Sequence, residues 1–553
     1  MSKKLKWTFT ILGIVSLLLL FNNKQLASTI FGEVKYRHTQ ISPGNIEVPH
    51  TRTLIWNNRS AFAENICNSW ADKTVSDNML DGKGNAPRIL LAKLIVNRDI
   101  PEVNKKIGKL TVWGNCGSSW VLNKKGDYDF TLAILTTIFW KFGDQPQLIY
   151  PETRDYLLNV LLSESGNKFS YSAPWTLGLV QETENHMLMT EGSRYLKNRW
   201  IMLHGNNDPF YDNLKNGMEH KILSFLNEMK TSGLYEFNSI PYIGYTITAL
   251  LNLEAFASDQ VKTEARNVLD YMNWCYALGS YQLKHYPPMR RRYEKAGIKE
   301  LTTDYQSIFM KSWLSFSQVT GFDQDISSGE VHALMGVCMP YRPADKVVDL
   351  LFNKGEGYFI KLGHGPESSP EIFAARQKYL ISAGGVNRGK SSLIVARPIC
   401  LFLNDSAKVL SSVIHLAGPG TDFMNWNNTG VYRNFACAAG PVIVPESFIP
   451  VQKNETWSVY STKDSLLIAV HSVADLGIIA VFKNRNAASL IAELIKANPN
   501  IEKLKTDFQF PGGHKIIYDV SAPKEKWVIV SVDGKLMDRN FDKWPLIEGD
   551  FHE

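Results

Sequence analysis

The chain has 553 residues, of which 44% are hydrophobic, 11% aromatic and 21% charged. These fractions exclude a mostly disordered, collagen-like or disulfide-dense chain, and the length predicts two to four domains at about 100–200 residues each. The formal charge is +6, but the first 28 residues hold four lysines and no acid, so the remainder has 56 basic against 54 acidic residues. Net charge therefore gives no support for nucleic-acid binding.

Residues 1–28 form a predicted signal peptide or N-terminal anchor. A lysine-rich start precedes an uncharged run of 14 residues, 8–21, which is shorter than the ~20 residues of a membrane-spanning helix. We expect cleavage near Ala27 or Ser28 and a secreted or periplasmic protein. The alternative is an uncleaved leader, in which residues 5–21 would anchor the protein to a membrane.

From about residue 87 to residue 318, apolar residues recur with the period of an α-helix. The pattern predicts helices over 87–95, 128–142, 152–163, 185–203, 216–232, 242–257, 261–278 and 304–316. Gly, Pro and Asn in the connections are typical helix stops. Such a succession of amphipathic helices favours an α/α array, either a solenoid or a closed toroid, and we assign it to residues 29–340.

After about Pro340 the apolar period changes to two. The pattern predicts short strands over 357–362, 378–382, 391–395, 466–470, 477–482 and 526–532. Antiparallel strands separated by Gly, Pro and Asn are typical of a β-sandwich, which we assign to residues 341–553. The predicted fold class is thus a multidomain α plus β protein, with an N-terminal (α/α) toroid followed by an antiparallel β-sandwich.

The six cysteines suggest neither a metal site nor a redox site. They are widely spaced and include no C-x-x-C pair, and the chain contains no HExxH sequence. A disulfide between Cys67 and Cys116 would suit an oxidising compartment, and small buried apolar residues are the alternative interpretation. We therefore expect no metal and no cofactor.

The first candidate site lies where the helix predicted over 185–203 begins. His186 is three residues before Met189 and continues the apolar stripe of that helix. Asn185 is placed to cap the helix. A capped helix with a buried, hydrogen-bonded histidine is the structural alternative to a functional role.

Two further candidate groups follow along the chain. Glu236 lies in the segment 235–242, where Pro241 suits the first position of a helix and places Tyr242 in its first turn. A tyrosine with a satisfied hydroxyl at an interface is the structural alternative. The second group, residues 285–294, contains two prolines and is expected to be a loop.

Residues 285–294 combine histidine, aromatic and arginine side chains. The candidate substrate-binding residues of this loop are His285, Arg290, Arg292 and Tyr293. Aromatic residues interleaved with arginine suit stacking on sugar rings and pairing with carboxylates. A basic loop exposed to solvent is the structural alternative.

These segments resemble the heparinase II/III-like family of bacterial polysaccharide lyases. The resemblance rests on Glu-Asn-His at 184–186 followed by Ser-Arg-Tyr-Leu at 193–196, on Gly-Leu-Tyr-Glu-Phe-Asn-Ser at 233–239 with Tyr242, and on Ala-Leu-Leu-Asn-Leu at 249–253. It extends over roughly residues 85–320 and implies an (α/α) toroid with a C-terminal β-sandwich. It also implies Asn, His, Tyr and Arg side chains in a substrate cleft.

The basic loop matches the family pattern only in part. The loop ends in Arg-Tyr-Glu at 292–294, which is similar to the end of the H-x-x-x-R-x-Y-E-like loop of the family, but Tyr-Pro-Pro-Met stands at 286–289, where Gly and Thr are expected. Either Arg290 or Arg292 is therefore the arginine expected to bind substrate.

The reaction implied is β-elimination on a uronic-acid-containing polysaccharide. Asn185 and one arginine would neutralise the substrate carboxylate and stabilise the enolate that develops. Tyr242 or His186 would remove the C5 proton, and a tyrosine would protonate the leaving oxygen. The expected partner is an acidic polysaccharide or oligosaccharide, and no nucleic acid is expected.

Two other classes of function fit the same residues. A glycoside hydrolase on an (α/α) toroid would need two carboxylates across the scissile bond. Glutamates are available for that role at Glu182, Glu184, Glu191 and Glu236. A non-catalytic glycan-binding surface protein would use the aromatic residues without a proton-transfer pair.

Overall fold

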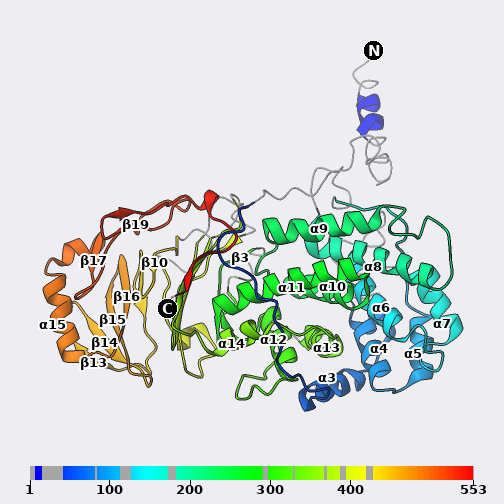
Figure 1. The fold of residues 1–553 in the computed structure, drawn as a ribbon, viewed down its shortest axis with the longest axis horizontal. Helices are drawn as coiled ribbons and strands as arrows, with labels where there is room; N and C mark the ends of the chain where they lie inside the picture. Colours follow the sequence, from blue (N-terminus) through cyan, green and yellow to red (C-terminus); the bar gives the residue numbers. More distant parts are fainter. Residues whose placement is uncertain are drawn as a thin grey trace.

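The computed structural model describes residues 7–14, 41–80, 84–112, 126–171, 182–290, 295, 297–327, 330–365, 370–385, 394–418 and 427–551. It is a mixed α and β protein, with most helices gathered on one side and the sheets on the other (Figure 1). The named strands pair in antiparallel fashion throughout the described residues. The predicted combination of helices and antiparallel sheets is confirmed.

The eight predicted helices are all present, and their ends lie within two residues of prediction. The helices before the large sheets are α3 (Ala61–Ala71), α4 (Asn85–Ile95), α5 (Ile100–Ile107), α6 (Asp129–Phe142), α7 (Pro151–Tyr156) with the π-helical turn η2 (Leu157–Leu161), α8 (Glu184–Leu203), α9 (Met218–Ser232), α10 (Ile243–Phe256), α11 (Asp259–Gly279), α12 (Tyr305–Leu314), α13 (Glu330–Cys338) and α14 (Asp345–Phe352). Helix α10 packs against α6, α8, α11, α12 and α13. Its nearly uniform apolar sequence suits this central position.

Three larger sheets follow in the described part of the chain. The seven-stranded sheet has the order β12 (Val442–Ile443), β9 (Ile414–Leu416), β8 (Ile399–Leu403), β6 (Tyr379–Gly384), β5 (Glu371–Arg376), β4 (Tyr358–Leu362) and β21 (Glu548–Phe551). The six-stranded sheet has the order β10 (Val431–Tyr432), β11 (Phe435–Ala438), β16 (Leu476–Lys483), β15 (Leu466–Val473), β14 (Ser458–Ser461) and β13 (Pro450–Lys453). The four-stranded sheet comprises β17 (Asp507–Gln509), β18 (Lys515–Tyr518), β19 (Ile529–Val532) and β20 (Lys535–Leu536). Helix α15 (Ala487–Ala497) precedes this last sheet, and its side-chain cap is Asn486.

The seven-stranded sheet is buried on both faces. In β8, Ile399 and Leu401 belong to a hydrophobic core shared with the six-stranded sheet, whereas Cys400 and Phe402 belong to the core of the helices. All five residues of β8 are buried. Because successive side chains of a strand point to opposite faces, the seven-stranded sheet lies between the helices and the six-stranded sheet.

The boundary assigned near residue 340 falls before α14, whereas the first strand predicted after it, 357–362, is present as β4. Helix α14 follows Pro340 and packs against α11, so the large sheets begin only at Tyr358. Short strands also occur earlier, namely β1 (Ser280–Tyr281), β2 (Lys284–His285) and β3 (Met289–Arg290). Strand β3 pairs with β7 (Ile394–Val395), and this pairing links the helical part to the chain between β6 and β8.

Parts of the predicted leader lie outside the described residues. Residues 7–14 are helical, and the described ranges include no helix long and apolar enough to cross a membrane. Cys67 is buried, but its predicted disulfide partner, Cys116, lies in the range 113–125, which the structure does not describe.

Candidate active site

His186 lies in the first turn of α8 and pairs with a carboxylate from another helix. Its Nδ1 is 2.5 Å from Oδ2 of Asp129, the first residue of α6. The two side chains are only 21% and 10% exposed. Burial alone would lower the pKa of the imidazole, but the charge and hydrogen bond of Asp129 raise this pKa to about 9. At neutral pH the ring is therefore protonated and positively charged.

Tyr242 lies beside His186, with the two ring centroids 6.4 Å apart and the ring planes at 46°. It is the residue before α10 rather than part of its first turn as predicted. The backbone N–H groups of Tyr242 and Ile243 both donate to the carbonyl of Ser239, at 3.0 and 2.9 Å, and so form the turn that begins the helix. The starts of α8 and α10 therefore meet at these two side chains.

Asn185 does not cap α8, and that prediction is wrong. The capping position is occupied by Thr183, and Asn185 is the second residue of the helix. Its Oδ1 accepts a hydrogen bond from the Thr183 hydroxyl at 2.5 Å. Its Nδ2 is fully buried and has no hydrogen-bond partner among the described residues.

Glu236 is buried next to the start of α8. Its backbone N–H donates to Oε1 of Glu184 at 3.0 Å, and both glutamates are at most 1% exposed. Glu184 is the residue before Asn185, so this hydrogen bond holds the connection between α9 and α10 against the candidate site.

The described part of the predicted loop, residues 285–290, begins at the end of β2 and ends in β3, and residues 286–288 between the two strands are loop. Arg290 lies in β3, with its guanidinium 3.8 Å above the ring of Tyr235. Its backbone N–H donates to the carbonyl of Phe237 at 3.1 Å. Arg290 is thus attached to the same α9–α10 connection as Glu236. Arg292 and Tyr293, the other predicted residues of this group, lie outside the described residues.

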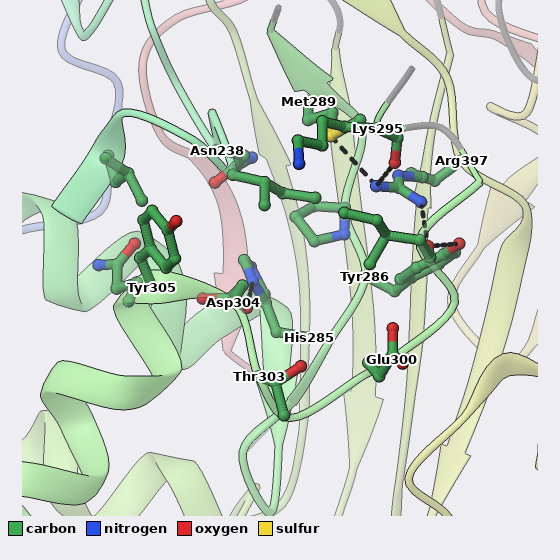
Figure 2. Close-up of a pocket in the computed structure, with 15 residues that line it drawn as sticks. Asn238, His285, Tyr286, Met289, Lys295, Glu300, Thr303, Asp304, Tyr305 and Arg397 are labelled. Atoms are coloured by element: carbon green, nitrogen blue, oxygen red, sulfur yellow. Dashed lines mark hydrogen bonds and ion pairs between the residues drawn. The ribbon is translucent and has the colours of Figure 1, made fainter. Parts of the chain in front are cut away.

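His285 lies apart from His186 and Tyr242, on the wall of a cavity of about 280 Å³ (Figure 2). Its Nδ1 is 3.1 Å from Oδ2 of Asp304, the residue that caps α12. The cavity combines an apolar wall with charged and polar groups, and its lining includes Asn238, Ile240, Ile243, Met289, Lys295, Glu300, Tyr305 and Arg397. Neither His186 nor Tyr242 belongs to this lining, although Ile243, the residue after Tyr242, does. The predicted site residues therefore lie in two neighbouring groups, one around His186 and Tyr242 and one at the cavity that His285 lines.

Arg397 supports the opposite wall of this cavity and was not predicted. Its guanidinium lies 4.2 Å above the ring of Tyr286. It donates to the carbonyls of Ile298 and Lys295 at 2.9 and 3.3 Å and to the sulfur of Met289 at 3.1 Å (Figure 2). These contacts fix the segment that follows β3.

The seven-stranded sheet contributes a second unpredicted group. His364 Nε2 lies 2.6 Å from Oε1 of Glu371, and Asn238 Nδ2 donates to the same oxygen at 2.9 Å. The His364 ring stacks on Phe237, with centroids 3.9 Å apart. His364 follows β4 by two residues and Glu371 begins β5, and their spacing in the sequence carries no signal of a site.

Asp129 could not be identified from sequence. It is an acidic residue in the first turn of a predicted apolar helix, where an acid commonly stabilises the helix dipole. No three His, Cys, Asp or Glu side chains gather closely enough to hold a metal ion within the described part of the chain.

Comparison of the sequence with protein-family models and with curated proteins gave no match.

Proposed function

We propose that the protein is an exported enzyme that cleaves a uronic-acid-containing polysaccharide by β-elimination, as heparinase-like lyases do. The observation that carries the proposal is the meeting of a protonated His186 with Tyr242, next to the buried amide of Asn185. A cation, an amide donor and a phenol are the groups that this chemistry needs around a sugar carboxylate. The leader-like residues 1–28 support export.

The C5 proton beside a carboxylate is weakly acidic, so the site must neutralise that carboxylate before a weak base can act. Asn185 Nδ2 would donate to a carboxylate oxygen, and Arg290 or Arg292 would add positive charge. Because His186 already holds its proton, Tyr242 would take the C5 proton while the electrons of the C5–H bond form the C4=C5 double bond. The C4–O bond then breaks, and a tyrosine hydroxyl protonates the leaving oxygen.

The finer architecture belongs to the same proposal. Contacts of α13 with α3 and α4 bring the end of the helical part back to its beginning, which supports an (α/α) toroid. The hydrophobic core shared by the six- and seven-stranded sheets supports a β-sandwich. In this proposal the toroid includes α14, so it ends after Phe352 rather than at residue 340.

The hydrolase alternative has less support from the described contacts. Glu191 is buried in an ion pair with Arg194, with Oε2 2.8 Å from Nε, and its other oxygen accepts from the backbone N–H of Ser170 at 3.1 Å. Glu184 Oε1 accepts a hydrogen bond from the backbone N–H of Glu236 at 3.0 Å. These two carboxylates are occupied by structural contacts, whereas hydrolysis needs a pair that faces the substrate.

The test is incubation of the protein with polygalacturonate, alginate, hyaluronan and heparan sulfate. A lyase creates new reducing ends together with the ultraviolet absorbance of an unsaturated uronate. Reducing ends without that absorbance would identify a hydrolase and overturn the proposal. Binding to these glycans without any new reducing ends would indicate the non-catalytic alternative.

A further inference from the structure

Asp129 has a relation to His186 that goes beyond starting α6. Its Oδ2 is 2.5 Å from His186 Nδ1, and its Oδ1 has no hydrogen-bond partner within the described residues. The two residues are 57 positions apart and come from different helices. The ring of Phe130 meets the imidazole edge-on, with centroids 5.4 Å apart. Asp129 and Phe130 therefore fix both the position and the orientation of the ring.

The charged groups around His186 are acidic. Besides Asp129, the carboxylates of Asp127 and Glu182 act on the imidazole, and all three raise its pKa. Tyr242, before α10, is a further titratable group beside the ring, with the two centroids 6.4 Å apart. A carboxylate that holds Nδ1–H leaves Nε2 as the nitrogen available to a ligand.

We propose that Asp129 is a positioning residue that holds His186 as an imidazolium, so that the ring binds the carboxylate of an acidic sugar. The role of the ring in β-elimination rests on the proposed lyase function. Its positive charge and its affinity for a uronate can be tested without that function. A histidine that already holds its proton serves as a fixed cation, and proton transfer then falls to Tyr242.

The direct test is NMR titration of the protein with isotope-labelled histidine, with His186→Gln identifying the His186 signal. The wild-type ring should titrate near pH 9. In Asp129→Asn the ion pair is lost while burial remains, so the midpoint should fall to 6.5 or below. A wild-type midpoint below pH 7, or an unchanged midpoint in Asp129→Asn, would overturn the proposal.

Asp144→Asn is the matched control. Asp144 Oδ1 lies 2.8 Å from Nε2 of His204 at the end of α8, but that pair is largely exposed. Removing this carboxylate should leave the titration of His186 unchanged. A shift of His186 in this variant would mean that the titration reports a general change in charge, which would contradict the specific role of Asp129.

Binding of glucuronate, followed by the same NMR signals at pH 8, gives a functional readout that does not require catalysis. If only the protonated ring binds, a change in its midpoint from about 9 to 6.5 reduces the protonated fraction, and the affinity, about thirtyfold. Asp129→Glu should restore part of the affinity. Equal affinity in wild type and Asp129→Asn would overturn the proposal, whereas absence of ultraviolet absorbance with every glycan would overturn only the lyase function. If Asp129→Asn fails to fold, the wild-type titration still decides whether the ring is charged.

Discussion

Two histidines of the helical part lie in opposite electrostatic surroundings. His186, at the α8–α10 site formed by Asp129, Asn185, His186 and Tyr242, has a carboxylate 2.5 Å from its ring. His332, on α13, is fully buried, and neither ring nitrogen has a hydrogen-bond partner among the described residues.

The surroundings of His332 also differ in charge. Its ring lies 4.8 Å from that of Tyr245 and 4.2 Å from that of Tyr305. Burial lowers the pKa of His332 well below its usual value, and the positive charge of Arg88 lowers it further. Burial acts in the same direction on both histidines, so the presence of a carboxylate decides which of them is charged. Of the two, only His186 can attract an anionic substrate.

The largest expected effect is a loss of catalytic rate on substitution at the α8–α10 site, with no comparable loss on substitution near His332. Tyr242→Phe removes only a hydroxyl at the α8–α10 site, and general acid–base catalysis contributes about 10²–10⁴ in rate. We expect kcat on the true substrate to fall by that factor, with little change in melting temperature. A correctly folded variant with unchanged kcat would exclude Tyr242 from proton transfer.

Tyr245→Phe is the control for this change. It removes a hydroxyl that hydrogen-bonds with Arg88 near His332, and the loss of such a bond costs about 1 kcal/mol of stability. We expect a lower melting temperature and a kcat within a few-fold of wild type, measured in the same assays.

The next effect concerns packing around His332. A Cβ at Gly244 would lie 2.6 Å from the His332 ring, so Gly244→Ala should lower the free energy of unfolding by about 1–3 kcal/mol. At Gly192 in α8, a Cβ would meet Leu253 at an ordinary 3.7 Å. Gly192→Ala should therefore be neutral or stabilising by up to ~1 kcal/mol, as measured by urea unfolding.

Acid should destabilise the protein through His332. Its folded-state pKa lies below the unfolded value near 6.5, so the unfolded chain binds more protons as the pH falls below that value. The free energy of unfolding should decrease by up to ~1.4 kcal/mol per pH unit below about pH 6.5. His332→Leu should flatten this dependence in urea titrations between pH 7 and pH 5. An equal slope in both proteins would contradict the prediction.

High pH should lower the free energy of unfolding through deprotonation of His186. Because its folded-state pKa is about 9, its stabilising contribution is complete below pH 6.5 and declines as the pH rises through 9. The difference in stability between wild type and Asp129→Asn should therefore narrow over this window. If the difference in free energy of unfolding between the two proteins stays constant from pH 6 to pH 10, the ion pair between Asp129 and His186 is not its cause.

The sequence predicted the helices well and the candidate site only in part. Long amphipathic helices keep their period whatever they pack against, and α8 began within one residue of prediction. Helices α13 and α14 were not predicted, because they have only nine and eight residues and such short segments hold few repeats of the helical period. Of the strand predicted over 526–532, only Ile529–Val532 forms β19, since apolar runs of this kind also occur in buried loops.

The site depends on contacts that no local pattern encodes. His186 and Tyr242 were found because each begins a helix, a feature visible in sequence. Asp129 meets His186 only through the packing of α6 against α8. The separation of His285 from His186 is likewise a result of packing, since residues of β2 and α12 enclose the cavity that His285 lines.

The position of β21 has a consequence for the order of folding. It forms the edge of the seven-stranded sheet beside β4, with Lys361 Nζ 2.8 Å from Glu548 Oε2. Because the chain between these strands runs over residues 363–547, their pairing closes a very long loop and should be a late, slow step. Until then β4 presents an unpaired edge to other chains. Newly made protein therefore needs protection from aggregation until β21 is in place.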